Sequence, residues 1–199
     1  KQNCELIVIA CNTASVTALR KLQTEYLPKN HPEKRILGVV VPTLEAATEL
    51  GSTQIGLIAT AYTVRSKIYE EEIAKINPQA SLYAQPTPLL VPLIENNGEQ
   101  YMDMVLNDYL SPILDEGLDS LILGCTHYIA IKDIVREMTK HSVRILSQDE
   151  IIPPKLKDYL NRHPEMEERF SKNGTFEIMA TDVSPSFIKN VEKLMANEL

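Results

Sequence analysis

Leu121 to Tyr128, LILGCTHY, and Leu6 to Ala14, LIVIACNTA, are two versions of one motif. Each begins with an unbroken apolar run and continues with a small residue, a cysteine and a residue that carries a hydroxyl or an amide. A buried parallel strand has this kind of continuous apolar sequence. The residues just past its carboxyl end lie where open α/β sheets bind ligands. We therefore expect Cys11 and Cys125 each to follow a central strand, with a helix starting directly afterwards.

The rest of the chain alternates between strand-like and helix-like segments. Further strands are predicted at residues 36–41, 54–60, 81–85, 119–123, 143–146 and 176–180. Helices are predicted at residues 13–26, capped by Asn12 or Thr13, and at 42–50, 63–75, 99–114, 127–140 and 149–160, with a last one opened by Ser184 and Pro185. Three prolines in residues 86–92 predict an ordered loop without a regular helix, with Glu95 at its tip.

This alternation, with its repeated motif, predicts an α/β fold of two related lobes. Each lobe is expected to be a mostly parallel sheet flanked by helices, with the active site in the cleft between them. We place the first crossing between lobes at residues 41–43 and the return crossing at residues 147–149. The first lobe then comprises residues 1–41 and 149–199 and is incomplete at its start, and the second lobe comprises residues 42–148.

Composition narrows the class of protein. The 199 residues, 44% of them hydrophobic, suffice for a well-formed core. A net charge of -7 without a Lys/Arg block argues against a nucleic-acid partner. The apolar runs are too short to cross a membrane. Three cysteines, an odd number, favour free thiols in a reducing cytoplasm over a disulfide framework.

The paired cysteine motifs favour proton transfer at carbon. At a helix N-terminus the dipole favours the thiolate and lowers the pKa of a thiol from about 8.5. The backbone N–H groups there can hold a carboxylate, and Asn12, Thr13 and Thr126 add polar donors. A small amino acid between two such ends would face one thiol on each side of its α-carbon. One thiolate and one thiol can then invert that centre, and this reaction requires no metal or organic cofactor.

Two other polar residues have possible roles at the second thiol: His127, within the second cysteine motif, and Glu95, on the proline-rich loop. His127 can orient or protonate Cys125, and Glu95 can neutralise an ammonium group. Simpler roles remain open, because His127 can cap a helix and a loop glutamate such as Glu95 is usually solvated. Thr60 can act as an N-cap. Cys4, which no polar residue of this pattern follows, is expected to be structural.

IACNTAS and LGCTHY together resemble the glutamate racemases of the aspartate/glutamate racemase superfamily. IGLIATAYTVRSKIY and PLLVPLIE resemble further segments of the same family, so the resemblance covers nearly the whole chain. It implies two α/β lobes and cofactor-independent interconversion of L- and D-glutamate, with the D-glutamate going to peptidoglycan synthesis. Carried over by position, Cys11 and Cys125 match the two proton donors and acceptors of the family.

The resemblance also implies roles for the neighbouring residues. The positions that match the family's substrate-binding residues are Asn12, Thr13, Thr60, Thr126 and His127. His127 is also implied to assist Cys125, and it favours glutamate racemases over aspartate racemases, which commonly carry an acidic residue there. Glu95 matches a catalytic acid. The expected partners are glutamate and, because the family tends to dimerise, a second copy of the chain.

The sequence departs from the family pattern in three places. The family's N-terminal Asp-Ser-Gly and Tyr-Gly segments have no match, and Ile129 stands where a proline is usual. Those segments normally precede the point where this sequence begins, so we expect a longer gene product and weak or no activity from these 199 residues alone. Two alternatives remain: an enzyme with one nucleophilic thiol, Cys125, paired with His127, or a non-catalytic ligand-binding fragment.

Overall fold

The computed structural model describes residues 4–181, 183–184, 187–188 and 191–192. The chain divides into two compact units, Lys1–Arg169 and Phe170–Leu199. All the strands that the structure describes belong to the first unit. The lobe boundaries drawn from the sequence, 1–41 with 149–199 and 42–148, stay a prediction.

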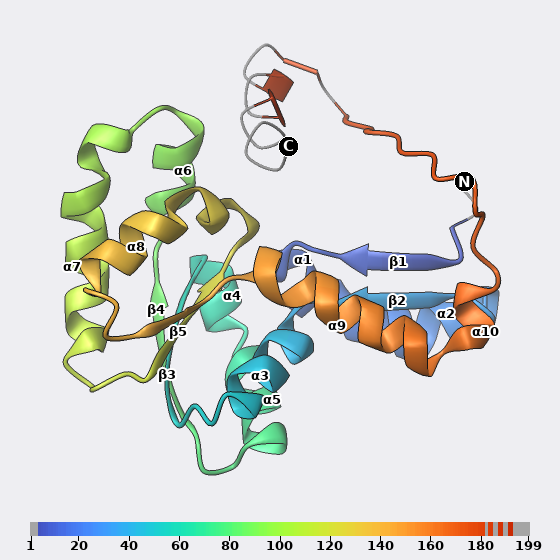
Figure 1. Cartoon of the computed structure of the whole chain (residues 1–199), viewed down its shortest axis with the longest axis horizontal. Coiled ribbons are helices and arrows are strands. Elements are labelled where there is room, and N and C mark those ends of the chain that lie inside the picture. The colour runs from blue at the N-terminus through green and yellow to red at the C-terminus, as the bar shows by residue number, and fades with distance from the viewer. Residues whose placement is uncertain (1–3, 182, 185–186, 189–190, 193–199) are drawn as a thin grey trace. The chain divides into compact units, whose positions relative to one another are not determined.

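The first unit contains two sheets, each made of parallel strands (Figure 1). β1 (Leu6–Ile9) pairs with β2 (Arg35–Gly38). The second sheet has the order β4-β3-β5-β6, formed by Ser81–Pro86, Gln54–Ala59, Ser120–Gly124 and Arg144–Leu146. All of its neighbouring strands run parallel. The prediction of an α/β fold with parallel sheets and flanking helices is confirmed.

The helical segments of this unit are α1 (Asn12–Lys21), the π-helical turn η1 (Leu22–Tyr26), α2 (Leu27–Asn30), α3 (Val40–Glu49), α4 (Ala61–Arg65), α5 (Ile68–Ile76), α6 (Leu90–Glu95), the 3-10 helix η2 (Glu99–Tyr101), α7 (Met102–Leu114), the 3-10 helix η3 (Thr126–Ile131), α8 (Lys132–Met138), α9 (Gln148–Arg162) and α10 (Pro164–Glu167). None of the helices in the described ranges is both long and apolar enough to span a membrane.

The two central strands of the second sheet are buried on both faces, which explains their unbroken apolar sequences. On β5, Leu121 and Leu123 contribute to the core cluster that includes residues of α7 and α8. Ile122, which points to the opposite face, joins the cluster that includes residues of α3 and α5. Helices thus cover both faces of this sheet, and the apolar run of the LILGCTHY motif fills two cores at once.

The proline-rich segment contains a helix, so the prediction of a loop there was wrong. Pro92 is the third residue of α6. The backbone N–H groups in the first turn of a helix have no intrahelical partners. A proline there therefore costs the helix no hydrogen bond. Glu95 is therefore the last residue of a helix rather than the tip of a loop.

Other helix boundaries also differ from the prediction. The first helix continues to Asn30, and the π-helical turn before Pro28 accommodates the proline ring. The helix predicted at residues 63–75 is divided at Lys67, whose φ of 59° is left-handed. The segment predicted as one helix from residue 127 is η3 followed by α8.

The helix expected from Pro42 begins two residues earlier, at Val40, so β2 is shorter than predicted. The prediction that Gly51 terminates this helix is confirmed. Gly51 has a φ of 75° and donates its N–H to the Thr48 carbonyl, while Ser52 donates to the Ala47 carbonyl. Both bonds belong to the glycine-terminated helix end that the sequence indicates.

In the second unit, the strand predicted at residues 176–180 is absent, and these residues have no regular structure. Phe176 and Ile178 are exposed, and no strand among the described residues pairs with this segment. A strand without a ladder of hydrogen bonds is not stable. The predicted cap at Ser184 is confirmed, because its hydroxyl accepts the N–H of Phe187 at 3.2 Å. Pro185 lies outside the described residues.

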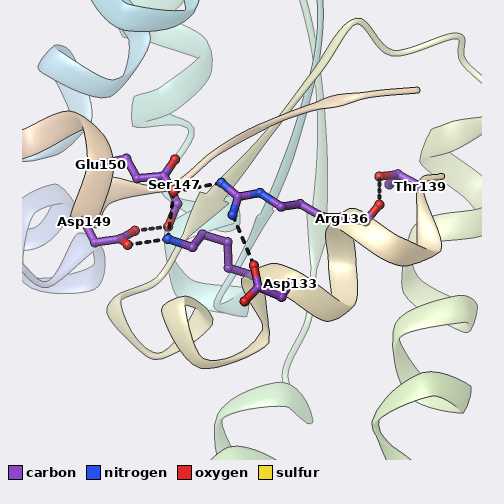
Figure 2. A network of polar contacts seen from close by, with 7 residues as sticks. Asp133, Arg136, Thr139, Ser147, Asp149 and Glu150 are labelled. Atoms are coloured by element: carbon purple, nitrogen blue, oxygen red, sulfur yellow. Dashed lines mark hydrogen bonds and ion pairs between the residues drawn. The ribbon is translucent and has the colours of Figure 1, made fainter. Parts of the chain in front are cut away.

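An ion-pair network joins α8 to the start of α9 (Figure 2). Lys132 Nζ lies 2.6 Å from an oxygen of Asp149 and 2.8 Å from one of Glu150. Arg136 contacts Glu150 at 2.8 Å and Asp133 at 3.1 Å. Asp149 and Glu150 stand in the first turn of α9, where the helix dipole also favours negative charge. The network therefore fixes the junction between β6 and α9.

The charges in this network depend on pH in a defined direction. Burial acts to raise the pKa of the Asp149 carboxyl, but hydrogen bonds from Lys132 and Ser147 outweigh it and hold the pKa below its ordinary value. The hydrogen bond from Lys132 is the main cause of a lowered pKa at Glu150. Lowered carboxyl pKa values add stability above the pKa of the unfolded chain, about 4. This stability is lost as the pH falls through the folded values.

We predict that Lys132→Met lowers the free energy of unfolding at pH 7 by roughly 1 kcal/mol, because Asp149 loses its cation and Glu150 keeps only its pair with Arg136. The difference from the unsubstituted protein should shrink as the pH falls below about 4, where the carboxyls become protonated. Urea unfolding at both pH values measures it. Lys75→Met, which removes an exposed pair with Glu72, is the control and should have little effect. A loss of equal size at both pH values would contradict this account.

Candidate active site

The residues that follow the strands meet at one edge of the first unit. β3 and β5 pair in register with Ala59 opposite Gly124. Thr60 and Cys125 are the next residues of these strands, so both stand at the carboxyl edge of the second sheet. The Thr13 hydroxyl, in the first turn of α1, lies 2.9 Å from the Thr60 hydroxyl. This contact brings the first cysteine motif to the same edge as the second.

Cys11 is the N-cap residue of α1. Its sulfur accepts the backbone N–H of Ala14 at 3.5 Å, and its side chain is exposed. The expectation that Asn12 or Thr13 would cap this helix was wrong, since the helix begins at Asn12 and the sulfur itself is the capping atom. The first thiol therefore stands at a helix N-terminus, as the motif predicts.

Cys125 is half-buried, and its environment differs from the one expected. Burial raises the pKa of this thiol, and negative charge at Cys11 and at Glu95 acts in the same direction. The backbone N–H of His127 and the hydroxyl of Thr126 favour the thiolate but do not outweigh burial. The expectation of a lowered pKa was therefore wrong for Cys125. The helix after it is a 3-10 helix of six residues, and desolvation of the charged form dominates.

The structure brings Glu95 and His127 to this thiol. His127 Nδ1 lies 3.8 Å from Cys125 Sγ, and His127 Nε2 lies 2.9 Å from Glu95 Oε1. Glu95 comes from the end of α6, and His127 comes from η3. A carboxylate thus orients an imidazole whose other nitrogen faces the sulfur.

Three threonine hydroxyls form a cluster between α1 and α4. Thr60 contacts Thr13 and also Thr63, at 3.0 Å. Thr60 accepts the Thr63 N–H as the N-cap of α4, which is the simpler role left open by the sequence. Thr63 was not found from the sequence, because a buried helical threonine has no distinctive pattern.

Asn12 lies in the interior, with 2% of its surface exposed. Its amide exchanges two hydrogen bonds with Gln148, and its oxygen also accepts the hydroxyl of Tyr69. Binding of a substrate carboxylate by Asn12 stays a prediction. Gln148 and Tyr69 were missed from the sequence, because their positions relative to Asn12 depend on contacts between distant segments.

The described side chains contain no group of three or more His, Cys, Asp or Glu arranged to hold a metal ion.

We predict that Cys11→Ser lowers the pKa of the Cys125 thiol, because it removes a negative charge that disfavours the second thiolate. The pH midpoint for alkylation of Cys125 by iodoacetamide, followed by peptide mass spectrometry, should shift to lower pH. Cys4→Ser is the matched control, because Cys4 is an exposed thiol that precedes β1, at the other end of that strand from Cys11. An unchanged midpoint in Cys11→Ser, or an equal shift in both variants, would show that the two thiols do not interact.

Comparisons with known proteins show which family the chain belongs to. The family model described as Asp/Glu/Hydantoin racemase matches residues 1–148. The glutamate racemase of Microcystis aeruginosa is 38% identical over 144 residues, which cover 71% of this chain and 49% of that protein. The glutamate racemase of Cereibacter sphaeroides is 32% identical over 202 residues, covering 95% and 72%. This chain thus spans about half of the first relative's length.

Solved structures show the same fold. The glutamate racemase of Francisella tularensis, in complex with D-glutamate, has a TM-score of 0.81 and 28% identity, over 98% of this chain and 71% of that one. A glutamate racemase isoform from Bacillus anthracis has a TM-score of 0.83 and 25% identity, over 96% and 70%. With the family model matching most of its length and these relatives beside it, the chain belongs to the Asp/Glu/hydantoin racemase family.

Proposed function

We propose that this chain carries the two-thiol active site of a glutamate racemase, which interconverts L- and D-glutamate without a cofactor. Cys11 and Cys125 are the proton acceptor and donor on opposite sides of the α-carbon. The observation that carries this proposal is the hydrogen bond between Thr13, of the first cysteine motif, and Thr60, which stands next to Cys125 at the carboxyl edge of the second sheet. Glutamate racemases among the relatives, one of them solved with D-glutamate, support the choice of substrate.

The electrostatic relation between the thiols supports two-base chemistry. Negative charge at Cys11 disfavours a thiolate at Cys125, so the pair tends to share one charge. Starting with a Cys11 thiolate, its sulfur takes the α-proton, and the Cys125 thiol gives its proton to the opposite face of the carbon. The old C–H bond breaks, a new one forms, and the centre is inverted. Cys125 ends as the thiolate, which is the state that starts the reverse reaction.

Neighbouring residues have roles in the same proposal. The α1 N-terminus, with Thr13, and the hydroxyls of Thr60 and Thr126 bind the substrate carboxylates. Asn12 contributes to the same binding. His127 assists proton transfer at Cys125 and is oriented by Glu95, which also carries charge opposite to the substrate ammonium group.

The cellular role follows from the product. D-Glutamate would supply peptidoglycan synthesis, and we propose that the enzyme is a homodimer. The three free cysteines support a reducing compartment, the cytoplasm.

A second candidate is an enzyme with a single nucleophilic thiol. The order carboxylate, imidazole, thiol in Glu95, His127 and Cys125 is the order of a nucleophilic triad. This candidate requires a covalent adduct on Cys125 alone and leaves Cys11 dispensable. The contact of the first cysteine motif with Thr60, beside Cys125, has no role in this candidate, which is why we favour the two-thiol enzyme.

We predict that the protein, in the full length that its gene encodes, incorporates deuterium at the α-carbon of both L- and D-glutamate in D₂O. Cys11→Ser and Cys125→Ser should each lower racemisation by about a thousandfold or more, because each removes an acid–base group. NMR and chiral chromatography measure the two rates. Cys4→Ser is the control, and its rates of deuterium incorporation and racemisation should equal those of the unsubstituted protein.

The outcomes separate the candidate functions. Full turnover in Cys11→Ser would favour the single-thiol enzyme. Glutamate binding without any exchange, in the unsubstituted protein, would favour a non-catalytic ligand-binding protein. Absence of both binding and exchange would remove glutamate as the substrate.

A further inference from the structure

Asn12, which directly follows Cys11, is held by side chains from other helices. The Tyr69 hydroxyl of α5 lies 2.6 Å from Asn12 Oδ1. Gln148, the first residue of α9, forms a double amide contact in which both bonds to Asn12 are 2.9 Å long. Gln148 is 6% exposed and Tyr69 is fully buried. These three residues form a buried polar network, which we call the Asn12 clamp.

Every proton direction in the Asn12 clamp is determined by the groups around it. The Thr43 hydroxyl donates its one hydrogen to the Val39 carbonyl at 2.7 Å. It therefore accepts from Gln148 Nε2, which lies 3.4 Å away. The nitrogen of Gln148 thus faces Thr43 and Asn12 Oδ1, and its oxygen faces Asn12 Nδ2.

Tyr69 completes the assignment. Burial, with a smaller effect of charge at Cys125, raises the pKa of its phenol, so the hydroxyl stays protonated and donates to Asn12. Asn12 Oδ1 then accepts two hydrogen bonds, and Asn12 Nδ2 gives one to Gln148. A flipped Asn12 amide would place donors against donors, so one orientation is strongly favoured. One Asn12 N–H is left for another acceptor.

The clamp is itself anchored to the second sheet's helices. Asp149 and Glu150, which follow Gln148, are paired with Lys132 of α8 (Figure 2). Ser147, which precedes Gln148, is hydrogen-bonded to Asp149. Gln148 therefore stands between fixed neighbours, and through it the first turn of α1 is tied to a segment 136 positions away.

We propose that Tyr69 and Gln148 are positioning residues for the first half-site: through Asn12 they hold the first turn of α1, so that Cys11 and the remaining Asn12 N–H face the substrate. The inference rests on the proposed function for the identity of that substrate. The second half-site has its own support, because Cys125 contacts His127 and shares no hydrogen bond with Tyr69 or Gln148 in the described part of the chain. Loss of the clamp should therefore slow the reaction of Cys11 without slowing that of Cys125.

The test compares the two thiols within one protein. Gln148→Leu and Tyr69→Phe are treated with iodoacetamide at pH 8, and the alkylation rates of Cys11 and Cys125 are followed by peptide mass spectrometry. Loosening of α1 weakens the hydrogen bond that the Cys11 sulfur accepts from the Ala14 N–H. The Cys11 rate should fall roughly two- to fivefold, the range expected from losing a helix-terminal interaction. The Cys125 rate should not fall; because negative charge at Cys11 disfavours the Cys125 thiolate, it should stay level or rise.

Asp119→Ala is the matched control for general destabilisation. The Asp119 carboxylate accepts the N–H groups of Thr53 and Gln54 at the opposite edge of the second sheet. This variant should unfold at lower temperature and keep the unsubstituted ratio of Cys11 to Cys125 alkylation. An equal change of ratio in Asp119→Ala would overturn the inference. An unchanged ratio in Tyr69→Phe would also overturn it. Because Tyr69→Phe removes a single oxygen, this variant tests the inference even if Gln148→Leu does not fold.

Turnover gives an independent measurement. If the protein racemises glutamate, Tyr69→Phe should raise KM more than it lowers kcat, because Asn12 is less well oriented for binding; a fall in kcat alone would contradict the inference. If the protein does not racemise glutamate, the proposed function fails by itself. The alkylation ratio still decides whether Tyr69 and Gln148 position Cys11.

Discussion

The parallel pairing of β3 with β5 is the constraint on which the site depends. Both strands are buried on both faces, so their register cannot slip by one residue without moving apolar side chains into the wrong core. That register places Ala59 opposite Gly124. It therefore also places Thr60 and Cys125 side by side at the end of the sheet. The position of the second thiol therefore follows from the packing of the whole second sheet and not from the residues of the site alone.

The first thiol reaches the same edge through polar contacts rather than through a shared sheet. β1 pairs only with β2 among the described strands, and the links from α1 to the rest of the unit include the hydroxyl of Thr13 and the amide of Asn12. Buried polar groups are costly unless each finds a partner, and this requirement makes them specific. An apolar contact would tolerate a small rotation of α1, whereas the paired amides of Asn12 and Gln148 tolerate much less.

The two half-sites derive from one motif but provide different environments. Cys11 is exposed and caps an α-helix, while Cys125 is half-buried and precedes a 3-10 helix. Burial and nearby negative charge favour the protonated form of Cys125, and the imidazole of His127 lies close to its sulfur. The two thiols therefore stand in different environments, and only the environment of Cys125 is seen to favour the thiol form. Two-base inversion requires one thiol and one thiolate, because both groups in the same state could not exchange a proton across the carbon.

The sequence by itself determined the class of fold and the location of both thiols. Continuous apolar runs predicted parallel strands, and the small residue, cysteine and polar residue after each run predicted the strand ends, because these patterns are local. The expectation of a buried central strand is confirmed for β5 but was wrong for β1, which has only β2 beside it among the described strands and leaves Ile7 exposed. Local patterns were wrong where neighbours decided the outcome. Pro92 fits the first turn of α6, and residues 176–180 lack a partner strand among the described residues. Only the tertiary structure decided the burial of Asn12, its pairing with Gln148 and the raised pKa of Cys125. Each of these depends on which distant groups surround a side chain, and the period of a sequence does not carry that information.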